Sequence, residues 1–65
     1  MINCEDLFIY FKDGTSAIFK GSNTIELHDD GLIVEQCKRV VWYCKENIDY
    51  FEYTKKEIKN ENNNM

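Results

Sequence analysis

The sequence predicts a mainly β domain, a small antiparallel meander or barrel of five or six short strands. Three observations lead to this prediction. Runs rich in Val, Ile, Phe, Tyr and Trp recur along the chain, and these residue types favour strands. Short segments rich in Gly, Asp, Asn and Lys separate the runs and have the composition of turns. Apolar residues make up 43% of the 65 residues and proline is absent, so the chain is too hydrophobic to be disordered.

The clearest local signal is a hairpin over residues 7–20, centred on Asp13-Gly14. An Asp-Gly pair tolerates positive φ at both positions and suits a two-residue type I′ turn. Such a turn places Phe8 opposite Phe19 in the hairpin. One face is then Leu7, Ile9, Phe11 and Ile18, and the other is Phe8, Tyr10, Ala17 and Phe19. Because both faces are apolar, each needs a cover from the rest of the chain or from another molecule.

Four more strands are expected after this hairpin, at residues 24–28, 32–37, 40–44 and 48–54. The first two flank Asp29-Asp30-Gly31, a turn in which Gly31 is expected to take positive φ. The last two flank the polar segment 45–47. Val, Ile, Tyr, Trp and Phe dominate the strands of this second half, which supports a β prediction for it.

A competing α+β prediction places an amphipathic helix over residues 33–59, after the hairpins. Apolar positions in this part recur at alternating spacings of three and four, as in a heptad seam. The seam residues are Val34, Cys37, Val41, Cys44, Ile48, Phe51, Lys55 and Ile58. Against the helix stand the β-branched and aromatic residues that crowd positions 40–43, so strands are preferred.

Residues 1–54 are expected to form one small domain, with residues 55–65 as a charged, Asn-rich flexible tail. A domain of this length lies near the lower limit for folding without disulfides, metal or a partner. At about 0.05 to 0.15 kcal/mol per residue, its stability is expected to be roughly 3 to 10 kcal/mol.

Charge and targeting signals narrow the functional classes. The net charge of −4 repels phosphate backbones, so direct nucleic-acid binding is not expected. Residues 1–6 lack the pattern of a secretory signal, and no apolar run approaches the roughly 20 residues that cross a bilayer. A cytoplasmic protein without membrane contact is therefore expected, and Cys4, Cys37 and Cys44 are expected to be reduced and to serve as small buried hydrophobic residues.

Catalytic, cofactor and metal sites are not expected. The segment His28-Asp29-Asp30 contains metal-ligand types, but neighbouring residues on an extended chain point to opposite faces and cannot converge on one ion. A solvated turn is the preferred interpretation. Ser16 and Ser22 lack a nucleophile motif, and a chain of this size offers little room for a substrate cleft, so the protein is not expected to be an enzyme.

Five segments between residues 7 and 53 carry a resemblance to known proteins: residues 10–15, 25–27, 29–31, 40–43 and 45–52. Their order resembles short, acidic, β-rich proteins of low-GC bacteria, their phages and their mobile elements. The resemblance implies a β fold. It also implies that roles of this class are open to the chain, including inhibition of a larger partner as in anti-CRISPR proteins, but it transfers no site residue.

The expected function is protein binding, as a small accessory or inhibitory protein that blocks a larger partner. Exposed aromatic residues with an acidic rim are expected to form the docking surface, because aromatic side chains dominate interface energetics. The expected residues are Phe8, Tyr10, Phe19, Trp42 and Tyr43, rimmed by Glu26, Asp29 and Asp30. The alternative is a structural module that covers its apolar surface by self-association into a homodimer or larger oligomer.

Overall fold

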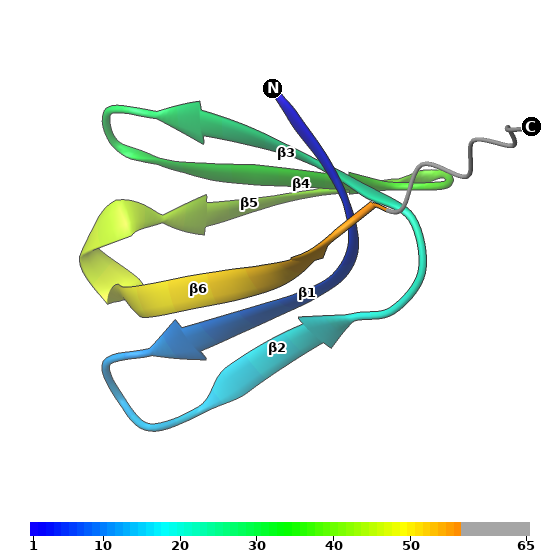
Figure 1. Ribbon diagram of the computed structural model, residues 1–65. Coiled ribbons are helices and arrows are strands. Elements are labelled where there is room, and N and C mark those ends of the chain that lie inside the picture. The colour runs from blue at the N-terminus through cyan, green and yellow to red at the C-terminus, as the bar shows by residue number, and fades with distance from the viewer. Residues whose placement is uncertain (57–65) are drawn as a thin grey trace, which may run out of the picture.

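The computed structural model describes residues 1–56, which form one curled antiparallel sheet with the shape of a half-barrel (Figure 1). The strands are β1 (Ile2–Phe11), β2 (Ser16–Phe19), β3 (Asn23–His28), β4 (Gly31–Gln36), β5 (Arg39–Cys44) and β6 (Ile48–Lys55), with the short 3-10 helix η1 (Lys45–Asn47) before β6. The strand order is β2-β1-β3-β4-β5, and β6 pairs with β1. The prediction of a mainly β fold with five or six antiparallel strands is confirmed.

The competing helix over residues 33–59 is wrong as far as residue 56, because this part of the chain forms most of β4 and all of β5 and β6. The β-branched and aromatic residues at positions 40–43 pair along β4 instead of lining a helix. One member of the heptad seam, Cys37, lies in the β4–β5 turn with a φ of 53°. Residues 57–59, and most of the predicted tail, lie outside the described residues.

Strand β1 organises the sheet because it pairs with three other strands (Figure 1). Its first residues, Ile2 to Cys4, pair with β3, and its later residues, Leu7 to Tyr10, pair with β2. Since β2 and β6 both pair with the later residues, they lie on opposite edges of β1. The β1–β6 register is irregular between Cys4 and Leu7, where β1 changes its partner on the other edge.

Two polar side chains hold the β2–β3 loop against this irregular part of β1. The Asp6 carboxylate accepts hydrogen bonds from the Gly21 backbone N–H at 2.9 Å and from Lys20 Nζ at 3.3 Å. The buried Asn23 donates through Nδ2 to the backbone oxygens of Phe19 and Gly21, both at 3.1 Å, and also to that of Glu5. These bonds satisfy backbone groups that a change of strand partner leaves unpaired.

The hydrogen bond from Gly21 and the charge of Lys20 lower the pKa of Asp6. A carboxyl whose pKa is lower in the folded state stabilises the fold above its unfolded pKa of about 3.9, and this contribution is lost as pH falls through the folded pKa. We therefore expect Asp6→Asn to lower the urea midpoint at pH 7, with the difference from the wild type vanishing near pH 2. A difference that stays constant from pH 7 to pH 2 would contradict the role of the charge.

The β1–β2 hairpin has a different register from the predicted one. Leu7 pairs with Phe19 and Phe8 with Ile18, one residue away from the predicted pairing, which is wrong. The reason is a three-residue loop: the Gly14 N–H donates to the Phe11 oxygen at 3.0 Å, and the Phe11 N–H donates to the Thr15 oxygen at 2.9 Å. Gly14 is left-handed with a φ of 92°, as in a type I turn followed by a bulge.

The new register exchanges the two faces of β2. A shift of one residue moves every side chain of a strand to the other face. Phe19 points into the half-barrel and is 4% exposed, whereas Ile18, expected beside Ile9, is 59% exposed on the outer face. The core thus contains the Phe19 ring, which the predicted two-residue turn would have placed on the opposite face of the sheet.

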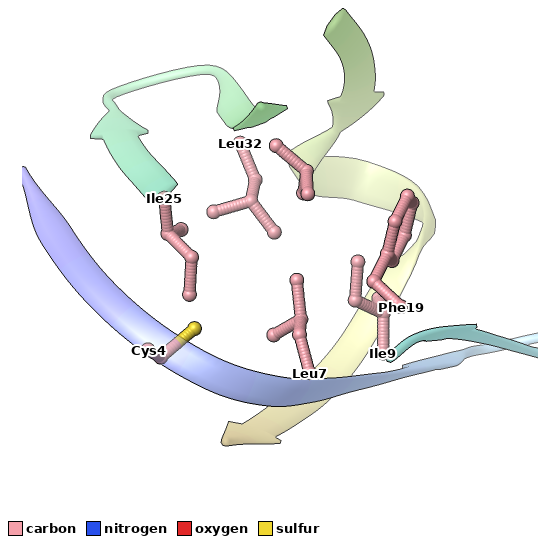
Figure 2. Packing of buried hydrophobic residues seen from close by; sticks show 7 residues of the cluster. Cys4, Leu7, Ile9, Phe19, Ile25 and Leu32 are labelled. Carbon is pink, nitrogen blue, oxygen red and sulfur yellow. The ribbon is translucent and has the colours of Figure 1, made fainter. Parts of the chain in front are cut away.

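The core fills the concave face of the curled sheet (Figure 2). It consists of seven buried side chains: Cys4, Leu7, Ile9, Phe19, Ile25, Leu32 and Val34. They come from β1 to β4, and half-buried side chains of β5 and β6 pack against them. The expectation of a small buried hydrophobic residue holds for Cys4, and burial, followed by the charges of Glu5 and Asp6, raises the pKa of its thiol. The expectation is wrong for Cys37, which is exposed in the β4–β5 turn, and Cys44 is only half-buried.

Candidate functional site

The five aromatic residues expected on one surface lie in three places. Phe8 and Tyr10 are on the outer face of β1, and Trp42 is on the outer face of β5. Phe19 and Tyr43 point inward, with ring centroids 6.2 Å apart in an edge-to-face arrangement. The expectation that Phe19 and Tyr43 are exposed is therefore wrong. The one-residue change in the hairpin register buries Phe19, and Tyr43 is half-buried because it packs against the Phe19 ring.

The outer face of β1, β2 and β6 carries an aromatic cluster with charges of both signs. Tyr10 stacks on Tyr50 with centroids 4.6 Å apart, and its hydroxyl donates to Glu52 Oε2 at 2.9 Å. That hydrogen bond raises the pKa of Tyr10. Lys20 Nζ lies 5.9 Å from the centre of the Phe8 ring. We call Phe8, Tyr10, Ile18 and Tyr50 the tyrosine cluster.

The outer face of β3, β4 and β5 carries a second surface, built from two cross-strand rows. One row is Glu26, Ile33 and Trp42, and the other is Thr24, Glu35 and Val40. Trp42 is 48% exposed and Val40 65% exposed. Together with His28 and the turn residues Asp29 and Asp30, we call these two rows the acidic Trp surface.

Trp42 is held in place by the strand beneath it. A Cβ atom on Gly31 would lie 2.2 Å from Trp42 Cη2, so the indole rests directly on the glycine backbone. The His28 ring is also near the indole, with the two ring centroids 6.3 Å apart. His28 Nε2 lies 3.1 Å from Glu26 Oε1. The prediction of positive φ at Gly31 is wrong: among described residues the positive-φ glycines are Gly14 and Gly21. Glycine is needed at position 31 because a Cβ there would meet the Trp42 ring and, at 2.5 Å, the backbone oxygen of Tyr43.

The acidic Trp surface has one sign of charge. Its carboxylates are Glu26, Asp29, Asp30 and Glu35, and none of its residues is Lys or Arg. Basic residues stand at the two ends of β5: Arg39 places its guanidinium 5.7 Å from the centre of the inward-pointing Phe19 ring, and Lys45, which follows the strand, donates its backbone N–H to the Asp30 oxygen. Of the three rim residues predicted from the sequence, Glu26 thus shares a cross-strand row with Trp42, and Asp29 and Asp30 lie in the β3–β4 turn next to Gly31; none of the three belongs to the tyrosine cluster.

Sequence reasoning missed Ile33, Glu35 and Val40 of this surface, and Tyr50 of the tyrosine cluster. The alternation of side chains along each strand was the available signal for Ile33, Glu35 and Val40. Tyr50 had no such signal, because its place beside Tyr10 depends on the pairing of β6 with β1. That pairing joins the two ends of the described chain.

An apolar cleft of about 480 Å³ opens at the end of the half-barrel, next to the acidic Trp surface. Its apolar lining includes Leu27, Leu32, Ile48 and Phe51, with Lys45 and Asp49 also in the wall. Within residues 1–56, no group of three or more His, Cys, Asp or Glu side chains is placed to hold a metal ion. Over the same residues, no helix has the length and apolar character needed to cross a membrane.

Comparisons with protein-family models, curated proteins and solved structures found no match to this chain. The chemistry of the site therefore has to be inferred from its geometry. A half-exposed, fixed indole among carboxylates offers an aromatic contact and negative charge, which is the chemistry of recognition.

Proposed function

We propose that the chain is a protein-binding protein that docks on a basic surface of a larger partner. The observation that carries the proposal is the acidic Trp surface: Trp42 is half-exposed and seated on Gly31, and the cross-strand rows of this face carry Glu26 and Glu35, with Asp29 and Asp30 in the adjoining turn. The residues that meet the partner are Trp42, Val40 and Ile33, with Glu26 and Glu35 beside them.

The expected energetics support this choice over the tyrosine cluster. Tryptophan is the residue type most enriched among interface hot spots, where truncation costs about 2 kcal/mol or more. A ring already fixed in position loses little conformational freedom on binding. Complementary charge speeds encounter and excludes partners with the same sign. The tyrosine cluster lacks the last property, because Lys20 and Asp6 contribute opposite charges beside it.

The consequence for the partner would be a blocked basic surface. A basic groove that binds phosphates or acidic segments cannot do so while carboxylates of another protein occupy it. This is the mode of action we propose for a small inhibitory or accessory protein, including one encoded by a phage or a mobile element. No catalytic step is part of the proposal.

The test is affinity capture from a lysate of the source organism with three versions of the chain. Trp42→Ala is expected to lose at least about tenfold of the captured partner, corresponding to about 1.4 kcal/mol or more. Tyr50→Ala is the matched control, because it removes an aromatic ring that is 55% exposed on the outer face of β6. Equal loss from the two variants, or no loss from Trp42→Ala, would contradict the proposal.

Sedimentation of the purified chain separates the proposal from self-association. We expect a monomer at micromolar concentration, because two copies joined through this surface would bring four carboxylates against four. A dimer that dissociates on replacement of Trp42 by alanine would identify a second copy as the partner.

A further inference from the structure

Strand β5 is an edge of the sheet. Within residues 1–56, β5 pairs with β4 and β6 pairs with β1, and no ladder joins β5 to β6. The half-barrel is thus open between these two strands, which lie near each other in Figure 1 with η1 connecting them. An open edge presents unpaired N–H and C=O groups to which another strand can add.

One backbone hydrogen bond shows which groups of β5 face outward. The Lys45 N–H donates to the Asp30 oxygen at 3.0 Å, continuing the β4–β5 register beyond Gly31 and Cys44. Hydrogen-bonded and non-hydrogen-bonded pairs alternate in an antiparallel ladder. Val40 and Trp42, an odd number of positions from Lys45, therefore turn their backbone N–H and C=O groups away from β4.

The two sides of this edge differ in chemistry. Outward-pointing side chains next to it are Val40 and Trp42, with Glu35 one strand further in. On the inner side, Tyr43 pairs with Leu32 and Leu32 with Leu27, and the last two line the apolar cleft. The outward-pointing side chains of a strand added here would lie beside an acidic, aromatic surface, and its inward-pointing side chains beside an apolar one.

We propose that an extended segment of the partner adds to β5 as a new edge strand, with a Lys or Arg beside Trp42 and apolar side chains on the inner side. This inference rests on the proposed function and names how the partner binds. The cation lies against the indole face and within reach of Glu35 across Val40. The alternating apolar side chains extend the inner row of Leu27, Leu32 and Tyr43 by one strand beyond Tyr43.

A second copy fits this edge less well. Two β5 strands related by a two-fold axis run antiparallel, which brings Arg39 of one copy near Lys45 of the other. Like charges on facing strands are destabilising. A segment whose one cation lies beside Trp42, in the middle of the strand, keeps that charge away from Arg39 and Lys45 at its two ends.

The test uses a synthetic peptide, acetyl-Thr-Val-Lys-Val-Thr-Val-amide, which alternates one cation with apolar residues. Trp42 is the sole tryptophan, so its fluorescence reports binding directly. We expect a dissociation constant of about 1 mM or below, typical of a short, weakly binding peptide. Two modified peptides provide the controls: one N-methylated at the lysine and at both threonines, and one with Lys replaced by Glu. In an antiparallel ladder with Lys opposite Trp42, the N–H groups of the lysine and the threonines are the ones that face β5. Each modified peptide is expected to bind at least about tenfold more weakly.

The matched protein variant is Val40→Pro, which removes an N–H that points away from β4 and so leaves the β4–β5 ladder intact. It is expected to lose at least about tenfold in peptide affinity, while its urea midpoint stays close to that of the wild type. Unchanged affinity after N-methylation or in Val40→Pro would overturn strand addition. Absence of binding by the Lys peptide at millimolar concentration would do the same. In either case the effect of Trp42→Ala on partner capture still decides the proposed function separately.

Discussion

Replacing Gly31 by alanine is expected to remove a large part of the stability of the chain. The added Cβ would lie 2.2 Å from Trp42 Cη2 and 2.5 Å from the backbone oxygen of Tyr43. The indole could rotate away, but the oxygen belongs to the β4–β5 ladder and can move only with that strand. We expect a cost of about 3 kcal/mol, the upper range for overpacking, against a total of roughly 3 to 10 kcal/mol for a domain of this length.

The measurement is urea unfolding followed by Trp42 fluorescence and by circular dichroism. Gly14→Ala is the matched control, because Gly14 has a φ of 92° but nothing within 4 Å of an added Cβ. Its expected cost is about 1 to 2 kcal/mol, from the left-handed conformation alone. The double variant Gly31→Ala with Trp42→Ala should recover only part of the loss, since the contact with the Tyr43 oxygen remains. A Gly31→Ala cost no larger than that of Gly14→Ala would contradict the packing argument.

Phe19→Ala is expected to have the second large effect. Phe19 is 4% exposed in the core, and its ring packs edge-to-face against the ring of Tyr43. Truncating a buried phenylalanine leaves a cavity and typically costs about 3 to 5 kcal/mol. We therefore expect the variant to be largely unfolded at room temperature if the total stability is no greater than this cost, and otherwise to have a strongly lowered urea midpoint.

Ile18→Ala is the matched control, because Ile18 is the neighbouring residue on the same strand and is 59% exposed. Its expected cost is about 0.5 kcal/mol or less. The pair of variants also tests the hairpin register. A two-residue turn at Asp13-Gly14 would reverse the expected order and make Ile18 the core residue, so a larger loss from Ile18→Ala would show that the three-residue loop is wrong.

The sequence was informative wherever structure depends on neighbours along the chain. The third to sixth strands start within two residues of the predicted positions, because β-branched and aromatic runs between polar turns specify strands locally. The helical alternative failed for the same reason: three- and four-residue spacings are weak evidence when the residues at positions 40–43 resist a helix. Trp42 was also identified correctly as an exposed aromatic residue.

The candidate surface was only partly predictable. Glu26, Asp29, Asp30 and Trp42 were named from the sequence and lie together, whereas Phe8 and Tyr10 belong to a different cluster. The sequence analysis placed Phe8 and Tyr10 on the same surface as Trp42, because the sequence does not show which strands are neighbours in the sheet. That information appears only when β1 pairs with β6 and β4 with β5.

The sequence by itself therefore determined the β class, the approximate strand positions and the acidic character of the protein, since all three follow from local composition. Tertiary structure alone decided the hairpin register, the burial of Phe19 and the need for glycine at position 31. Each of these depends on an atom brought close from elsewhere: the Thr15 oxygen across the loop, the core around β1, and the Trp42 ring over Gly31. A one-residue difference in a loop changes every contact of the strand that follows it, and no local propensity records that choice.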